Sequence, residues 1–157
     1  MSKKEIGILK VRNESGNCCD IMLYGVIDAL GMLNSGEFAQ HINYCIQNKI
    51  ICCNFYVNSL GGDVFEGVAM RSQVYRALNN GIVINWYIDG IALSMMAVLC
   101  SLPGTTCYAP VSARMMFHQV QGGAQGTSDM MRQNADLIDG YNKDFISDLC
   151  KKTGMSA

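Results

Sequence analysis

The sequence predicts a single α/β domain built around a largely parallel sheet. Apolar runs of strand length alternate along the chain with stretches whose apolar residues recur at helical spacing. Three of the runs end at residues able to carry chemistry, namely the Gly61-Gly62 pair, Ser94 and His118. Since functional groups of open α/β sheets gather at the carboxyl ends of the strands, this pattern predicts one site at one edge of the sheet.

The first half of the chain predicts a hairpin followed by a β-loop-α-β unit. Strands over residues 5–12 and 20–27 flank an Asn/Ser/Gly turn at 13–17. A helix is predicted over 35–49, where Phe38, Ile42 and Cys45 recur at steps of three or four. The continuous apolar run at 50–57 predicts a strand buried on both faces of the sheet. The loop 58–63 then leads into a helix from Val64 that ends at Asn79-Asn80-Gly81.

The second half repeats this alternation. The predicted elements are a strand over 82–88 that breaks at Gly90, a helix from Ser94 to about 102, strands at 105–108 and 114–117, and a helix over 127–153. Thr127 or Ser128 can cap the last helix. A helix this long either projects to meet a neighbouring subunit or packs across its own domain, and the sequence leaves both arrangements open.

Composition narrows the class of protein. The formal net charge is −1 and no Lys/Arg run occurs, so we expect no nucleic-acid partner. No apolar run approaches the roughly 18 residues of a membrane span, and residues 1–6 lack the apolar core of a signal peptide, so we expect a cytoplasmic protein with no membrane partner. The eight cysteines include no Cys-x-x-Cys pair and the chain has two histidines, which predicts reduced thiols, no metal and no cofactor.

Ser94, His118 and the paired glycines together fit acyl transfer. Each has an ordinary alternative: a serine that starts a helix commonly only caps it, a lone histidine after a strand is commonly a core or turn residue, and Gly-Gly is commonly a tight turn. Acyl transfer requires a nucleophile, a base and donors for the oxyanion. Ser94 is the candidate nucleophile, His118 the candidate base, and the N–H groups of Met95 and of the Gly61-Gly62 loop are candidate donors.

The same main-chain donors leave other functions open. A crotonase-like acyl-CoA enzyme would use an equivalent oxyanion hole but also a carboxylate base, for which Glu66 and Asp63 are the acids near the loop. A non-catalytic ring or scaffold subunit is a third alternative. The segment around Ser94 is not the Gly-x-Ser-x-Gly turn of α/β-hydrolases.

Five segments in consistent order resemble the ClpP family of self-compartmentalised serine peptidases. They are residues 56–64 (Tyr-Val-Asn-Ser-Leu-Gly-Gly-Asp-Val), 90–97 (Gly-Ile-Ala-Leu-Ser-Met-Met-Ala), 112–119 (Ser-Ala-Arg-Met-Met-Phe-His-Gln), 122–126 (Gly-Gly-Ala-Gln-Gly) and 152–156 (Lys-Thr-Gly-Met-Ser). The resemblance implies a crotonase-type spiral of βαβ units, with a head over 1–119 and a handle over 120–157. The handle's glycine-rich strand and long helix would join two rings of a homo-oligomer.

The resemblance also implies roles for single residues. Ser94 would be the nucleophile and His118 the base, with the oxyanion held by the N–H groups of Gly62 and Met95. A polypeptide substrate would lie beside Gly61, Gly62 and Asp63 and beside Gln119 and Val120, as an added strand. Hydrolysis itself would need no ATP. The partner would be either an ATPase unfoldase or, if the chain is similar to the phage prohead (head maturation) proteases, phage capsid proteins.

The sequence departs from the family pattern at several positions. Leu60 and Val120 stand where the family usually has proline, and Met96 where it often has glycine. The family's third catalytic residue, an aspartate, lies beyond the Thr-Gly-x-Ser motif, so we expect a chain truncated at its C-terminus with weak or no peptidase activity by itself. Losing that carboxylate in a triad costs about 10⁴-fold in turnover.

Overall fold

A curved sheet with helices packed on one face forms the body of the chain. The computed structural model describes residues 12–14, 17–31 and 33–156. β1 (Arg12–Glu14) pairs antiparallel with β2 (Cys18–Ile27), and β3 (Cys52–Gly62), β4 (Val83–Leu93) and β5 (Thr106–Tyr108) continue the sheet in parallel. β6 (Arg114–Met116) pairs parallel with the far end of β4. The predicted parallel sheet is confirmed. The antiparallel pairing expected of the hairpin is present, but β1 includes residues 13 and 14, which were predicted to lie in the turn, and residues 5–11, 15 and 16 lie outside the described part.

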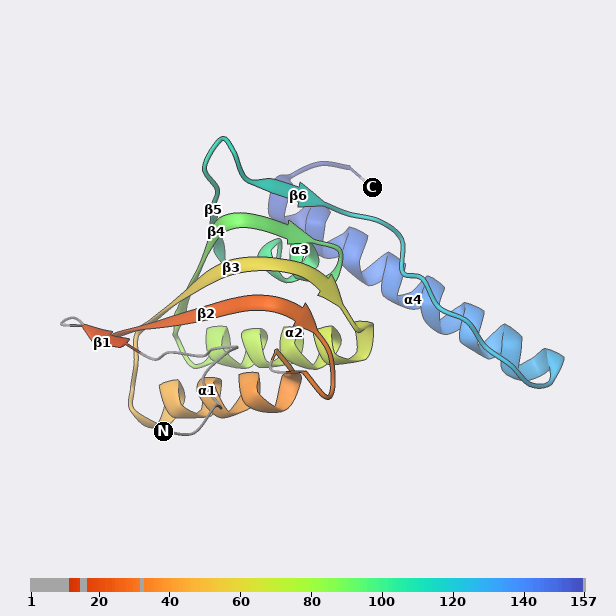
Figure 1. Cartoon of the computed structure of the whole chain (residues 1–157), viewed down its shortest axis with the longest axis horizontal. Helices are drawn as coiled ribbons and strands as arrows, with labels where there is room; N and C mark the ends of the chain where they lie inside the picture. Colours follow the sequence, from red (N-terminus) through yellow and green to blue (C-terminus); the bar gives the residue numbers. More distant parts are fainter. Residues whose placement is uncertain (1–11, 15–16, 32, 157) are drawn as a thin grey trace.

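Helices α1 (Ser35–Gln47), α2 (Val64–Asn79) and α3 (Met95–Cys100) cover the inner face of this sheet (Figure 1). The core lies between them, where stacked rings of Phe38, Phe55 and Trp86 join α1 to β3 and β4. The helix predicted over 35–49 is therefore confirmed, and so is the helix that begins at Val64.

The prediction that the 50–57 strand is buried on both faces is wrong. Phe55 and Val57 are fully buried, but Asn54 and Tyr56 between them are partly exposed, so burial alternates along β3. The outer face has no helix over it among the described residues (Figure 1). It carries instead a hydrogen-bonded row of Asp20, Asn54 and Asn85 and a stacked row of Tyr56, Tyr87 and Tyr108.

Two strands run further than the sequence predicts. β3 continues to Gly62 and β4 to Leu93, each past a register irregularity, rather than ending at residues 57 and 88. The glycines and polar residues at 58–62 and 89–90 indicated loops, but pairing with β2 and β6 keeps both segments extended. The two strands therefore carry the Gly61-Gly62 pair and the residue before Ser94 to the same edge.

The long helix α4 (Ser128–Thr153) projects beyond the sheet (Figure 1). Thr127 caps its start by accepting from Met130 N–H, and Gly154, with φ of 75°, closes its end. We call residues 141–153 the docked half, because Phe145 packs against the core and Asp148 bonds to Arg71. Residues 128–140 are the projecting half. Packing across its own domain, one of the two arrangements that the sequence left open, is thus confirmed for the docked half, and contact of the projecting half with a neighbouring subunit stays a prediction.

The segment before α4 is not a strand, contrary to the glycine-rich strand implied by the resemblance. Residues 120–126 pair with no strand among the described residues, and a strand requires a ladder partner. Instead Gly122 passes close to Ile138 of α4, where a Cβ would lie 3.0 Å from its Cδ1. The segment therefore runs outward beside α4, and the helix returns alongside it to the body (Figure 1).

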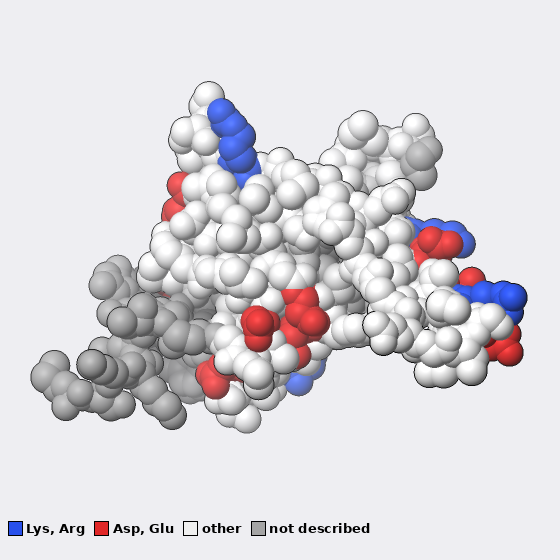
Figure 2. Space-filling model, turned by 45° about the vertical axis from the view of Figure 1, so that its right-hand side comes forward, with Lys and Arg blue, Asp and Glu red and all other residues white. Residues whose placement is uncertain are grey.

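The charged side chains, the helices and the cysteines of the structure can be compared with the expectations drawn from composition. In Figure 2, acidic side chains lie just below the centre of the face, and charges of both signs gather toward the side on which α4 projects. Within the described ranges, no helix is both long and apolar enough to cross a bilayer. All eight cysteines lie in the described part of the chain and form no disulfide there, and Cys19, Cys45, Cys53 and Cys100 are buried.

Candidate functional site

Strand pairing brings Ser94 and His118 together. β6 pairs with the end of β4 in the register Leu93 to Met116, and the next N–H along β4, that of Ser94, donates to Met116 O at 2.8 Å. His118 follows two residues after Met116, so it leaves the sheet beside Ser94. The imidazole Nε2 lies 2.7 Å from Ser94 Oγ.

Ser94 has a strained backbone. Its φ of 54° and ψ of −126° lie outside the left-handed helical region that a non-glycine turn residue usually occupies. Such a conformation costs about 1–3 kcal/mol and is typical of functional sites. The hydroxyl makes no capping bond to α3, so the ordinary cap interpretation does not describe this serine. In this conformation the hydroxyl contacts His118 instead.

The second imidazole nitrogen fixes the tautomer of His118. Nδ1 lies 2.6 Å from the carbonyl oxygen of Gln119. Since a carbonyl only accepts hydrogen bonds, Nδ1 carries the proton and donates it. In the neutral ring Nε2 is then the acceptor, and the hydroxyl of Ser94 donates to it. This is the protonation pattern that a general base for Ser94 requires.

The paired glycines allow the close approach of β3 to the serine turn. A Cβ at Gly61, whose φ is 81°, would overlap Leu93 O and lie 2.9 Å from both Met95 N and Ser94 Cβ. A Cβ at Gly62 would overlap Ile27 O. Only glycine therefore permits this packing, in which Gly61 lies directly beside residues 93–95 and Gly62 lies directly beside Ile27 of β2.

A cleft of about 480 Å³ opens over these groups. Gly62, Ser94, Met95 and His118 line its floor, and Phe145 from the docked half of α4 closes one side. An adjoining apolar pocket of about 180 Å³ lies behind His118, between α3 and α4. The arrangement offers a hydroxyl, an imidazole and main-chain amides to a ligand that also has an apolar side chain to bury.

The other residues predicted to contact the substrate do not all line the cleft. Val120 lines the cleft and Gln119 lines the adjoining pocket. Gly61 lies behind the serine turn, outside the cleft wall. The carboxylate of Asp63 accepts from Glu66 N–H at 2.9 Å and caps α2. A contact of these residues with substrate remains a prediction.

Three contributors were missed by the sequence analysis. Gly67 of α2 leaves room for the side chain of Met95, whose Sδ would lie 2.7 Å from a Cβ at that position. Asn142 and Phe145 reach the site from α4. A glycine inside an amphipathic helix was an available signal for the first, but only the docking of α4 reveals the other two.

Acids near the site are occupied elsewhere. Glu66 Oε2 accepts from Ser35 N–H at 2.7 Å, at the start of α1, and Glu66 does not line the cleft. In the part of the chain that the structure describes, no cluster of histidine, cysteine and carboxylate side chains could hold a metal ion. The cleft itself is lined by Ser94, His118 and the main chain of Gly62 and Met95.

Comparison with known proteins gives consistent matches. The Clp protease family model matches residues 35–157. The ATP-dependent Clp protease proteolytic subunit 2 of Chlamydia trachomatis (serovar D) is 38% identical over 104 residues, which are 64% of this chain and 49% of that protein. Proteolytic subunit 1 of Chlamydia felis is 41% identical over 86 residues, 53% of this chain and 40% of that protein. The matched region thus spans about half the length of these curated relatives.

Proposed function

Because the chain belongs to the Clp protease family, we propose that it is the core of a serine endopeptidase in which Ser94 is the nucleophile and His118 the general base. The observation that carries this proposal is the 2.7 Å contact between Ser94 Oγ and His118 Nε2, made from a strained serine backbone. The resemblance of the surrounding motifs to the family supports the same assignment.

The proposed reaction is two-step acyl transfer. Ser94 Oγ attacks the carbonyl carbon of a peptide bond while His118 Nε2 takes its proton, and the ring then returns the proton to the leaving amine. Water repeats the sequence on the acyl-enzyme. The N–H groups of Gly62 and Met95 would hold the oxyanion, each donor lowering the barrier by about 3–4 kcal/mol. Met95 is the first residue of α3, so its N–H has no acceptor within that helix.

The substrate is proposed to be a polypeptide with an apolar side chain next to the scissile bond. The pocket behind His118 is lined mainly by Val98, Phe117, Phe145, Ile146 and Leu149. Burial there favours an apolar group by roughly 25 cal/mol per Å². The extended segments that end at Gly62 and follow His118 would pair with the substrate main chain on either side.

The proposal extends to assembly and partners. We expect a homo-oligomeric ring in which residues 120–157 act as a handle between two rings. The word ATP-dependent in the names of the relatives supports an ATPase unfoldase partner. Phage capsid proteins remain the alternative partner. An acyl-CoA enzyme is less well supported, since Glu66 is bonded to Ser35 rather than directed into the cleft.

We expect this activity to be low. His118 Nδ1 donates to a neutral carbonyl rather than to a carboxylate, and a carboxylate in that place stabilises the imidazolium that forms during catalysis. Turnover of fluorogenic peptides should therefore fall well below that of a complete Ser-His-Asp enzyme.

A fluorophosphonate probe tests the assignment. The wild-type chain should be labelled, Ser94→Ala should not, and His118→Ala should react about 10²–10⁴-fold more slowly. Absence of labelling in a chain that still assembles, judged by light scattering, would favour a scaffold subunit. Acyl-CoA binding without labelling would favour the crotonase-like alternative.

A further inference from the structure

The peptide between Gln119 and Val120 is held from both sides. Its carbonyl accepts from His118 Nδ1 at 2.6 Å, and its N–H donates to Oδ1 of Asn142 on α4 at 2.8 Å. Both hydrogen bonds belong to one planar unit, so fixing the N–H also fixes the direction of the carbonyl. Val120 can donate because it is not proline, which has no N–H.

We propose that Asn142 is a positioning residue for His118, acting through the 119–120 peptide, and this inference rests on the proposed peptidase function. The bonds form a continuous chain from Asn142 Oδ1 through Val120 N–H, Gln119 C=O and His118 to the hydroxyl of Ser94. An N–H that donates polarises its amide and strengthens the carbonyl as an acceptor. Asn142 thereby favours the tautomer in which Nδ1 is protonated and Nε2 is free to accept from Ser94.

The docked half of α4 fixes Asn142 in place. Asp148 and Lys152 of this half bond to Arg71 and Thr105 of the body, and Phe145 packs against the core. Asn142 is partly buried beside them. The position of α4 against the body therefore controls whether His118 is set to act as a base.

The test compares four chains: wild type, Asn142→Ala, Asn142→Asp and Asn134→Ala. Asn142→Asp keeps an acceptor oxygen for Val120 N–H. Asn134 lies two turns earlier on the projecting half and serves as the matched control. Asn142→Ala should lower kcat for a fluorogenic peptide, and the rate of fluorophosphonate labelling, by about 10-fold to 100-fold, by analogy with the loss on removing the outer hydrogen-bond partner of a metal-ligating histidine. KM should change little, and the other two variants should behave as wild type.

The tautomer supplies a readout that does not depend on catalysis. The chain has two histidines, so His41→Gln leaves His118 as the only imidazole in a long-range ¹H–¹⁵N correlation spectrum. In the His41→Gln chain that keeps Asn142, the spectrum of His118 should show a protonated Nδ1 and an unprotonated Nε2. Asn142→Ala should give averaged nitrogen shifts, and Asn142→Asp should restore the wild-type spectrum. If Asn142→Ala lowers the thermal midpoint by more than a few degrees, Asn142→Ser replaces it.

The outcomes separate this inference from the peptidase proposal. An unchanged tautomer in a folded Asn142→Ala chain overturns the positioning role, whatever the activity. A changed tautomer together with no Ser94-dependent labelling of the wild type supports the positioning role and counts against the peptidase. Equal loss of kcat in Asn142→Ala and Asn142→Asp would also overturn it, because the acceptor would then be irrelevant.

Discussion

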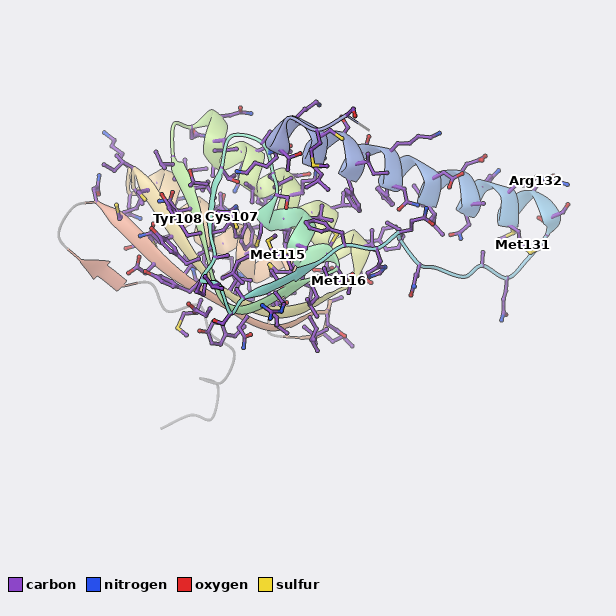
Figure 3. The ribbon with its side chains drawn as sticks, turned by 90° about the horizontal axis from the view of Figure 1, so that it is seen from above. Cys107, Tyr108, Met115, Met116, Met131 and Arg132 are labelled. Atoms are coloured by element: carbon purple, nitrogen blue, oxygen red, sulfur yellow. The ribbon has the colours of Figure 1, made fainter. Side chains whose placement is uncertain are left out.

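The two halves of α4 belong to one continuous helix yet have opposite relations to the body. In the docked half Asp148 is 4% exposed and Phe145 packs on the core, whereas Met130, Met131 and Leu137 of the projecting half are 54%, 47% and 42% exposed. Figure 3 shows Met131 and Arg132 at the free end of the helix, far from Met115 and Met116 on β6 beside the body. One half thus lines the candidate site, and the other exposes apolar side chains away from it.

The largest expected difference between the halves concerns two ion pairs of equal length. Arg71–Asp148 and Asp129–Arg132 both have N···O distances of 2.7 Å, but the side chains are 23% and 6% exposed in the first pair and 82% and 72% in the second. Asp148→Ala should lower the free energy of unfolding by about 3 kcal/mol, because it leaves a partly buried guanidinium unpaired. Asp129→Ala should cost under about 1 kcal/mol.

Urea denaturation of both variants measures this difference. Asp148→Ala should also slow fluorophosphonate labelling, since the docked half carries Asn142. Equal stability losses in the two variants would mean that burial does not distinguish the halves.

A smaller difference is expected for apolar side chains. Phe145 packs on the core and stacks on Tyr141 with ring centroids 6.1 Å apart. Phe145→Ala should cost about 2 kcal/mol, below the 3–5 kcal/mol of a fully buried phenylalanine because the ring is partly exposed. Leu137→Ala on the projecting half should change stability by less than about 0.5 kcal/mol. If Phe145→Ala and Leu137→Ala unfold at the same thermal midpoint, this result would contradict the docking of residues 141–153 against the body.

The contrast between the docked and projecting halves of α4 also explains which features the sequence could predict. The alternation of strands and helices around a parallel sheet, the helix predicted over 35–49, the helix from Val64 and the meeting of Ser94 with His118 follow from local pattern and from the rule that functional groups gather at strand ends. The reach of β3 to Gly62 and of β4 to Leu93 does not, because pairing with neighbouring strands overrides the turn signals of residues 58–62 and 89–90.

Tertiary docking accounts for the features that the sequence left hidden. Nothing in the periodicity of α4 separates Asn142 from Asn134, since both stand among polar residues of one long helix. Asn142 becomes part of the site only because Asp148, Lys152 and Phe145 fix this half against the body. Likewise, the outer face of β3 is left without a helix among the described residues because α1, α2 and α3 all pack on the inner face. The continuous apolar run at 50–57 gives no sign of this one-sided packing.

The projecting half should affect association rather than stability. Met130 and Met131 together with Leu137 expose apolar area that a neighbouring subunit could cover. Met130→Gln with Met131→Gln should shift the chain toward monomer in light scattering while changing the urea midpoint little. A wild-type chain that is already monomeric at high concentration, or an unaltered oligomer in the double variant, would argue against the handle as an assembly surface.

The smallest expected effect is a pH dependence of the free energy of unfolding that arises outside α4. The two halves of α4 should therefore be compared at a pH where this dependence is absent. Burial of His41 on α1 lowers its pKa below the usual 6.5, an effect only partly offset by nearby Glu37. The unfolded chain therefore binds a proton at a higher pH than the folded one, so stability falls as pH decreases from about 7 through that window. Urea midpoints measured between pH 5 and 8 should show this slope, and His41→Gln should flatten it. Above pH 7 the imidazole is neutral in both states, and the differences between the halves of α4 can then be measured without this contribution.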